Sequence, residues 1–190
     1  MKRSGIGDIL KFTGKFFSKP RFTGSILPSS SFLGRAMAQF VKFSPEQIVV
    51  ELGPGTGPVT AQLLKSGIPP ENLYCIEFDG GLCEILRRRF PDVAILNDSA
   101  ENLRSLLAGE RRGICAIVSS LPFLSLPKAV GEKIVSESEG ALQSGGRFIQ
   151  FTYNLNRDPR EVGFKAMAHV ACKKVYLNVP PARVDAFEKR

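Results

Sequence analysis

The chain has 190 residues, a formal net charge of +8 and 43% hydrophobic residues, enough apolar material for one sizeable core. It contains no run of 18 apolar residues that could cross a bilayer as a helix. A single histidine, His169, and four scattered cysteines without a C-x-x-C pair argue against His-based triads and metal sites, and they indicate reduced core cysteines in a cytosolic protein. We expect His169, whose neighbours are apolar, to have a packing role.

The first 24 residues differ in charge from the rest of the chain. They hold six of the 26 basic residues and one of the 18 acids, so +5 of the net charge of +8 lies there. Read as a helix, they place lysines opposite an apolar face, which suits the surface of an anionic membrane. An ordinary helix packed on the domain is the alternative. The apolar face would hold Ile6, Ile9, Leu10, Thr13, Phe16 and Phe17.

We therefore expect a membrane-associating helix over residues 1–24 and a second unit over residues 25–190. Where the two meet, Gly24 and Pro28 bracket a segment that reads as a loop. This loop would serve either as a lid over a site or as a passive linker, and its residues favour neither role.

The most informative motif is Glu51-x-Gly53-x-Gly55-x-Gly57, which follows an apolar strand signal over residues 48–52. Glycines at every second position let the backbone turn tightly and come close to a ligand. A carboxylate at Glu51 would repel a pyrophosphate, and it suits a ligand that carries a cation. A glycine-rich turn in some other α/β protein is the alternative.

Two further acids follow short strand signals. Residues 73–77 end in Glu77, and an acid at the end of the second strand is placed to accept hydrogen bonds from ribose hydroxyls. Asp79 lies beyond that strand, where we expect it to cap the next helix. Asp98 follows the strand signal at 93–96.

Strand and helix signals alternate along the chain, which predicts an α/β fold with a parallel sheet and helices on both faces. The hairpin-like segments 170–177 and 183–188, which turn at Pro180-Pro181, indicate an antiparallel last strand. The expected strands are 48–52, 73–77, 93–96, 114–118 and 146–153, and the expected helices are 58–66, 81–90, 100–107, 128–139 and 159–166.

Ligands of such sheets bind beyond the carboxyl ends of the strands. We therefore expect the polar and aromatic side chains at these ends to converge on one rim. They are Glu51, Glu77, Asp98, Ser119, Tyr153 and Tyr176.

The Glu-x-Gly-x-Gly-x-Gly stretch resembles motif I of the class I S-adenosylmethionine-dependent methyltransferases, whose cofactor has a sulfonium and an α-ammonium group. The resemblance implies a Rossmann-like seven-stranded sheet of order 3-2-1-4-5-7-6. It also implies that Glu77 binds the ribose and that Asp98 binds the adenine amino group, with Ser99 and Ala100 beside it. The alternative is that Asp98 or Ser99 only caps the helix at 100–107.

The stretch Ser119-Ser120-Leu-Pro-Phe123 is similar to the Asn-Leu-Pro-Tyr motif of the rRNA adenine dimethyltransferases, with Ser120 in place of Asn. In that family the motif grips the target amine and packs an aromatic ring on the base. For Phe123, a place in the core is the alternative. The tract that begins at Ser31 occupies the position of their Gln-Asn-Phe-Leu motif, which implies contact with the methionine end of the cofactor.

The longer string Ser-Leu-Pro-Phe-Leu-Ser-Leu-Pro over 120–127, with the ends of the chain, resembles the bacterial phospholipid N-methyltransferases. This resemblance covers most of the chain. It implies stepwise methylation of phosphatidylethanolamine towards phosphatidylcholine, with S-adenosylmethionine as cofactor. It also implies a monomer at the inner face of the cytoplasmic membrane, with an anionic membrane surface and no nucleic acid as partner.

The substrate side of the site follows from the same resemblance. Phe123, Tyr153 and Tyr176 would offer aromatic faces to the amine, because methylated ammonium groups favour cation–π contact. Arg183, after the Asn178-Val-Pro-Pro-Ala segment, would bind the lipid phosphate in preference to Arg157 or Arg160. The alternative functions are an rRNA adenine N6-dimethyltransferase and a cofactor-binding membrane module without catalysis.

Overall fold

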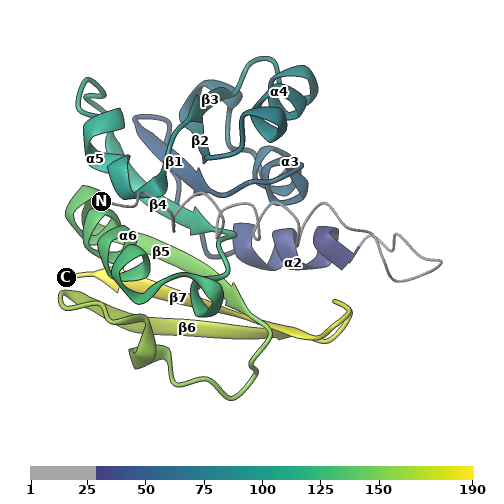
Figure 1. Cartoon of the computed structure of the whole chain (residues 1–190), viewed down its shortest axis with the longest axis vertical. Helices are drawn as coiled ribbons and strands as arrows, with labels where there is room; N and C mark the ends of the chain where they lie inside the picture. Colours follow the sequence, from purple (N-terminus) through teal and green to yellow (C-terminus); the bar gives the residue numbers. More distant parts are fainter. Residues whose placement is uncertain (1–28) are drawn as a thin grey trace, which may run out of the picture.

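The computed structural model describes residues 29–190, which form one seven-stranded sheet with helices on both faces (Figure 1). The strand order is β3-β2-β1-β4-β5-β7-β6; β1 to β5 are parallel, and β7 runs antiparallel to both of its neighbours. The strands are β1 (Gln47–Leu52), β2 (Leu73–Glu77), β3 (Ala94–Asn97), β4 (Gly113–Ser119), β5 (Leu142–Thr152), β6 (Met167–Val175) and β7 (Ala182–Lys189).

Helices cover the two faces of this sheet in separate groups. The α-helices are α2 (Ser29–Ala38), α3 (Pro58–Lys65), α4 (Gly80–Arg89), α5 (Leu103–Leu106) and α6 (Lys128–Ala141). The first apolar cluster joins α2, α3 and α4 to one face, and the second joins α5 and α6 to the other. Within the described range, no helix is long and apolar enough to span a membrane.

The sequence of strand β1 is almost entirely apolar because both faces of the strand are covered. Val49 belongs to the first cluster, whereas its neighbours Ile48 and Val50 belong to the second, and all three are fully buried. Alternate residues of a strand point to opposite faces, so a strand covered by helices on both sides needs apolar residues at every position.

The expected sheet order and the antiparallel last strand are confirmed. The helix expected over 159–166 is wrong, because only a single 3-10 turn forms at Pro159–Val162. Asp158 caps that turn, and Gly163 ends it with a left-handed backbone at φ 87°. The helix expected over 100–107 divides into a 3-10 turn at Ala100–Asn102 followed by the short α5.

Helix α2, which the sequence did not predict, begins at Ser29, directly after the segment bracketed by Gly24 and Pro28. Residues 1–28, which include the expected membrane helix and the Gly24–Pro28 bracket, lie outside the described part of the chain. Helix α2 buries Leu33 and Met37 in the first cluster. At Gly34 it packs so closely on α3 that an added Cβ would lie 3.2 Å from the Cα of Val59.

This close contact gives a test of the packing between α2 and α3. Gly34→Val should lower the free energy of unfolding by about 1–3 kcal/mol, because the added side chain must push the backbone of Val59 away. Chemical denaturation of the purified chain measures the change.

The matched control is Gly131, which also lies inside a helix and whose added Cβ would meet Phe123 at an ordinary 3.8 Å. Gly131→Ala should raise stability by about 0.5–1 kcal/mol, since alanine favours the helix. A Gly34→Val variant as stable as the wild type would contradict the close packing of α2 on α3.

Candidate active site

The loop that follows β1 is built around three glycines, all with positive φ: 66° at Gly53, 60° at Gly55 and 84° at Gly57. A Cβ added at Gly53 would collide with Leu121, and one at Gly57 would collide with the ring of Phe90. At Gly55 an added Cβ would meet no atom within 4 Å. Two of the glycines therefore permit close packing, whereas Gly55, although buried, leaves space beside its Cα that a ligand group can enter.

Glu77, at the end of β2, holds this loop in place. Its Oε2 accepts a hydrogen bond of 3.0 Å from the Gly55 N–H, and its Oε1 accepts one of 3.0 Å from the Asp79 N–H. Burial raises the pKa of this carboxyl group. Each oxygen keeps a lone pair that can accept a further hydrogen bond from a ligand hydroxyl. Asp79 caps α4 through the Leu82 N–H, as the sequence predicted.

Glu51 is fully buried within β1. Its Oε2 accepts hydrogen bonds from the Thr60 hydroxyl at 2.6 Å and from the Cys75 thiol at 3.7 Å. Its Oε1 has no hydrogen-bond partner among the described residues. Burial raises the pKa of Glu51 to about 7. A buried carboxylate oxygen without a partner is suited to accept a hydrogen bond from a cationic group.

Asp98 and Ser99 follow β3 and lie beside Glu77. The Asp98 N–H donates to the Glu77 backbone carbonyl at 3.1 Å, which joins the ends of β2 and β3. The Asp98 Oδ1 accepts from the Ser99 N–H at 2.6 Å and from the Asn102 side chain at 2.8 Å. Ser99 caps the turn that begins at the buried Ala100. The Ser99 side chain therefore has a capping role in this turn.

Ser119 ends β4 and Ser120 follows it, next to the end of β1. The Ser120 N–H donates to the Leu52 carbonyl at 2.9 Å, and the Ser119 hydroxyl accepts from the Leu121 N–H at 3.3 Å. Both serines are buried, and the Ser120 hydroxyl has no hydrogen-bond partner in the described chain. Phe123 packs edge to face on the buried Phe148, with ring centroids 6.1 Å apart, so the structure favours the core alternative for Phe123.

Tyr153 and Tyr176 directly follow β5 and β6, which end at the same edge of the sheet because both are antiparallel to β7. Tyr153 is half-exposed and packs edge to face on Phe151 at 5.4 Å. Burial of part of its ring raises the pKa of the phenol. Ser31, by contrast, is half-buried in α2, the helix that packs on α3.

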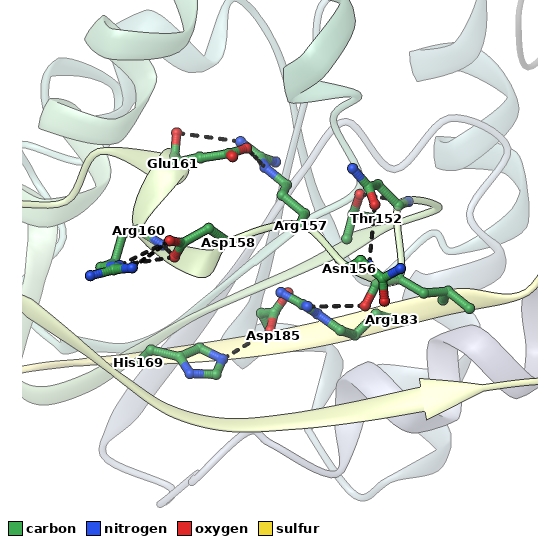
Figure 2. A network of polar contacts seen from close by, with 11 residues as sticks. Thr152, Asn156, Arg157, Asp158, Arg160, Glu161, His169, Arg183 and Asp185 are labelled. Atoms are coloured by element: carbon green, nitrogen blue, oxygen red, sulfur yellow. Dashed lines mark hydrogen bonds and ion pairs between the residues drawn. The ribbon is translucent and has the colours of Figure 1, made fainter.

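Arg183 lies in a polar network, not at an open site (Figure 2). It is buried, and its Nε donates to the Asp185 Oδ2 at 2.9 Å while its Nη1 donates to the Leu155 carbonyl at 3.2 Å. The other Asp185 oxygen lies 2.9 Å from the Nε2 of His169. The sequence assigned Arg183 to a lipid phosphate, but Asp185 already compensates its charge.

The other two candidate cations are paired in the same way (Figure 2). Arg157 is buried and donates to Glu161, and Arg160 forms a bidentate pair with Asp158. All three arginines considered for the lipid phosphate therefore have acidic partners.

The raised pKa of Glu51 predicts how stability changes with pH. Between pH 4.5 and about 7, the folded chain holds a proton at Glu51 that the unfolded chain releases, so the free energy of unfolding falls as pH rises through this range. The loss is at most about 3 kcal/mol. In denaturation of the cofactor-free protein, Glu51→Gln should remove it, and the variant should gain stability relative to wild type between pH 5 and pH 8.

The control is Glu84→Gln, which changes an exposed carboxylate on α4. It should keep the pH dependence of the wild type. Parallel pH profiles for Glu51→Gln and wild type would show that Glu51 does not carry this effect.

The fold and the arrangement of the strand ends invite comparison with known proteins. No family model matches the chain. It is 31% identical over 151 residues to an ornithine lipid N-methyltransferase of Singulisphaera acidiphila, which covers 76% of this chain and 78% of that protein. It is 29% identical over 115 residues to the ribosomal RNA small subunit methyltransferase A of Thermotoga petrophila, which covers 59% of this chain and 41% of that protein.

A solved structure agrees with these relatives in fold. The magnesium protoporphyrin IX methyltransferase of Synechocystis PCC 6803, with bound S-adenosylmethionine, superposes with a TM-score of 0.71 at 8% identity and covers all of both chains. The chain therefore belongs to the class I S-adenosylmethionine-dependent methyltransferases, and S-adenosylmethionine is its cofactor.

Proposed function

We propose that this enzyme methylates the amine of phosphatidylethanolamine and of its methylated derivatives, towards phosphatidylcholine. The observation that carries the proposal is the similarity to a lipid N-methyltransferase over 78% of that protein's length. The rRNA methyltransferase named above is matched over less than half of its length. Because the lipid relative is named for an ornithine lipid, the amine of such a lipid is the second candidate substrate.

The residues at the strand ends fit the cofactor. Glu77 offers two carboxylate oxygens to the ribose hydroxyls, and the unpartnered Glu51 oxygen suits the cationic amino-acid end. We assign Asp98, with Ser99 and Ala100, to the adenine of the cofactor. We assign Ser31 and Ser119 to contacts with the rest of the cofactor. The open space at Gly55 lets the ligand approach the backbone. The bound cofactor supplies an electrophilic methyl group on its sulfonium.

The protein must present the lipid amine as a free base. An alkyl amine is mostly protonated at neutral pH, and removal from water lowers its pKa. The Ser120 hydroxyl, which is buried without a partner, can accept a hydrogen bond from the amine N–H. The raised pKa of Tyr153 keeps its phenol neutral at physiological pH. Tyr153 therefore acts through its oxygen lone pairs and its ring face, not as a phenolate base.

The setting we propose for this reaction is the inner face of the cytoplasmic membrane, with the enzyme as a monomer. The support is the charge of residues 1–24, which hold +5 of the net +8 and alternate lysines with apolar residues. Each basic residue near an anionic leaflet contributes about 1 kcal/mol to the free energy of membrane binding.

The open space at Gly55 tests the assignment of the cofactor site. Gly55→Ala should weaken S-adenosylmethionine binding at least about tenfold, because the methyl group fills space that the ligand needs. Gly67→Ala is the matched control, since Gly67 also has positive φ, 98°, and nothing within 4 Å of its added Cβ. Both variants should lose about 1–2 kcal/mol of stability through backbone strain. Calorimetric titration that finds the same affinity for both would remove Gly55 from the site.

The substrate is tested by supplying labelled S-adenosylmethionine with phosphatidylethanolamine, an ornithine lipid or ribosomal RNA in separate reactions. Thin-layer analysis should find label in mono-, di- and trimethylated phosphatidylethanolamine. Label in the ornithine lipid alone would favour the second candidate. Label in RNA and in neither lipid would overturn the lipid proposal.

In the same assay, Ser120→Ala and Tyr153→Ala should slow turnover about tenfold or more, and Tyr153→Phe should be milder because it keeps the ring face. Cofactor affinity should stay close to wild type in all three, since no hydrogen bond within the described chain joins either side chain to Glu51, Gly55 or Glu77. Wild-type turnover in both alanine variants would remove Ser120 and Tyr153 from the amine site.

A further inference from the structure

A groove of about 320 Å³ lies between α2 and the end of β6. Phe32 and Arg35 of α2 line one wall, one helical turn apart. Lys173, Lys174, Tyr176 and Leu177, which belong to β6 and the turn that follows it, line the other. Two segments that are about 140 residues apart in the chain thus combine aromatic, aliphatic and cationic side chains in one surface.

The apolar part of this surface is unusually open to solvent. Tyr176 is 66% exposed, Leu177 69% and Val179 68%, and all three lie in the turn between β6 and β7. Phe32, across the groove, is 38% exposed. Large apolar side chains that cluster on a surface, unlike single ones, mark sites of contact with a protein, a ligand or a membrane.

The cations of the groove differ from the arginines of the polar network. Arg157, Arg160 and Arg183 each pair with an acid. The Lys173 amine donates to the neutral Gln39 side chain at 2.6 Å. Arg35 and Lys174 are exposed, and no ion pair found among residues 29–190 includes them or Lys173. The groove therefore presents three positive charges that are available to an anionic partner.

The groove also opens at the edge of the sheet that carries the candidate active site. Tyr176 follows β6 at the same edge where Tyr153 follows β5, since Arg183 of β7 lies in register with both Thr152 and Lys174. Helix α2 packs on α3, and α3 begins directly after the glycine loop. A flat partner bound to this surface would therefore face the mouth of the site.

We propose that this surface, made of Phe32, Arg35, Lys173, Lys174, Tyr176, Leu177 and Val179, docks the enzyme on an anionic phospholipid bilayer. The apolar side chains enter the interface while the three cations meet lipid phosphates. The inference rests on the proposed function, since it explains how a lipid amine would reach the site from the membrane. Residues 1–24, with a net charge of +5, and a second copy of the same basic groove both carry the wrong charge to occupy it.

The chain has no tryptophan, so a single introduced one reports on its own surroundings. Leu177→Trp places the probe on the docking surface. Ile85→Trp is the control, because Ile85 is also an exposed aliphatic residue but lies on α4. This helix packs beside β3, the outermost strand on the side of the sheet away from β6. Vesicles of phosphatidylcholine, with and without phosphatidylglycerol, are added to the full chain in the absence of cofactor.

With phosphatidylglycerol vesicles, the emission of Leu177→Trp should shift to the blue and be quenched by brominated acyl chains, whereas that of Ile85→Trp should do neither. An unchanged spectrum of Leu177→Trp while the protein sediments with the vesicles would overturn the proposal, because residues 1–24 would then be the only anchor. A blue shift that depends on protein concentration without vesicles would also overturn it, in favour of a second copy.

The charges are tested in a second variant. Arg35→Gln with Lys174→Gln should lower the partition coefficient for phosphatidylglycerol vesicles about fivefold for each cation removed. Lys65→Gln with Arg88→Gln removes the same charge from exposed positions on α3 and α4 and should have little effect. Equal losses in the two double variants would show that net charge, not the groove, governs binding.

The outcome is separable from that of the proposed function. Turnover of phosphatidylethanolamine dispersed in detergent should be the same for the wild type and for Arg35→Gln with Lys174→Gln, because the membrane is absent. Loss of turnover in detergent would mean that these cations act in the active site, and it would overturn the docking role. Wild-type protein that binds the vesicles through Leu177 but methylates no lipid would refute the proposed function alone.

Discussion

The arrangement of this molecule depends on the carboxylate of Glu77. Its two oxygens accept hydrogen bonds from the Gly55 and Asp79 N–H groups, and its backbone carbonyl accepts one from Asp98. One residue thus connects the loop after β1, the start of α4 and the end of β3. Because the three strands are parallel, their carboxyl ends already lie at one edge, and Glu77 fixes the backbone that connects them. The Cβ position of Gly55, in the loop that Glu77 holds, has no atom within 4 Å among the described residues.

Glu51 complements that arrangement at a cost to stability. A fully buried carboxylate with one unpartnered oxygen is destabilising in the empty protein, and Thr60 offsets only part of this penalty. Sites that bind charged ligands often retain such a group, because the ligand restores the missing hydrogen bond. The structure thus contains, within two neighbouring strands, one acid that organises the backbone and one with a carboxylate oxygen that has no partner among residues 29–190.

The glycine loop and the strand ends beside it could largely be predicted from the sequence, since their signals are local. The apolar run of β1, the glycine spacing and the acid that ends β2 occur within about 30 residues, and each follows from strand periodicity or backbone sterics. Helix α2 was not predicted, because its first residues, Ser29-Ser30-Ser31, are poor helix formers. What stabilises the helix is its packing against Val59 of α3, a contact between segments that are distant in the sequence. The polar network around Arg183 could not be predicted for a related reason. Asp185 lies two residues away on the same face of β7, but His169 joins the network only through the register of β6. The cationic groove combines Arg35 with Lys173 and Lys174, a juxtaposition that only the fold creates.

The position of β7 has a consequence for how the molecule is assembled during synthesis. Strands β1 to β4 are complete once Ser119 has been made, and they pair with one another in parallel. Strand β6, in contrast, has β7 as its one neighbour in the sheet that residues 29–190 form, although β7 is made after it. As the chain leaves the ribosome, β6 must therefore wait unpaired until β7 inserts between it and β5. The half built on β1 to β4 can fold first, and the half that contains β6 and β7 forms last.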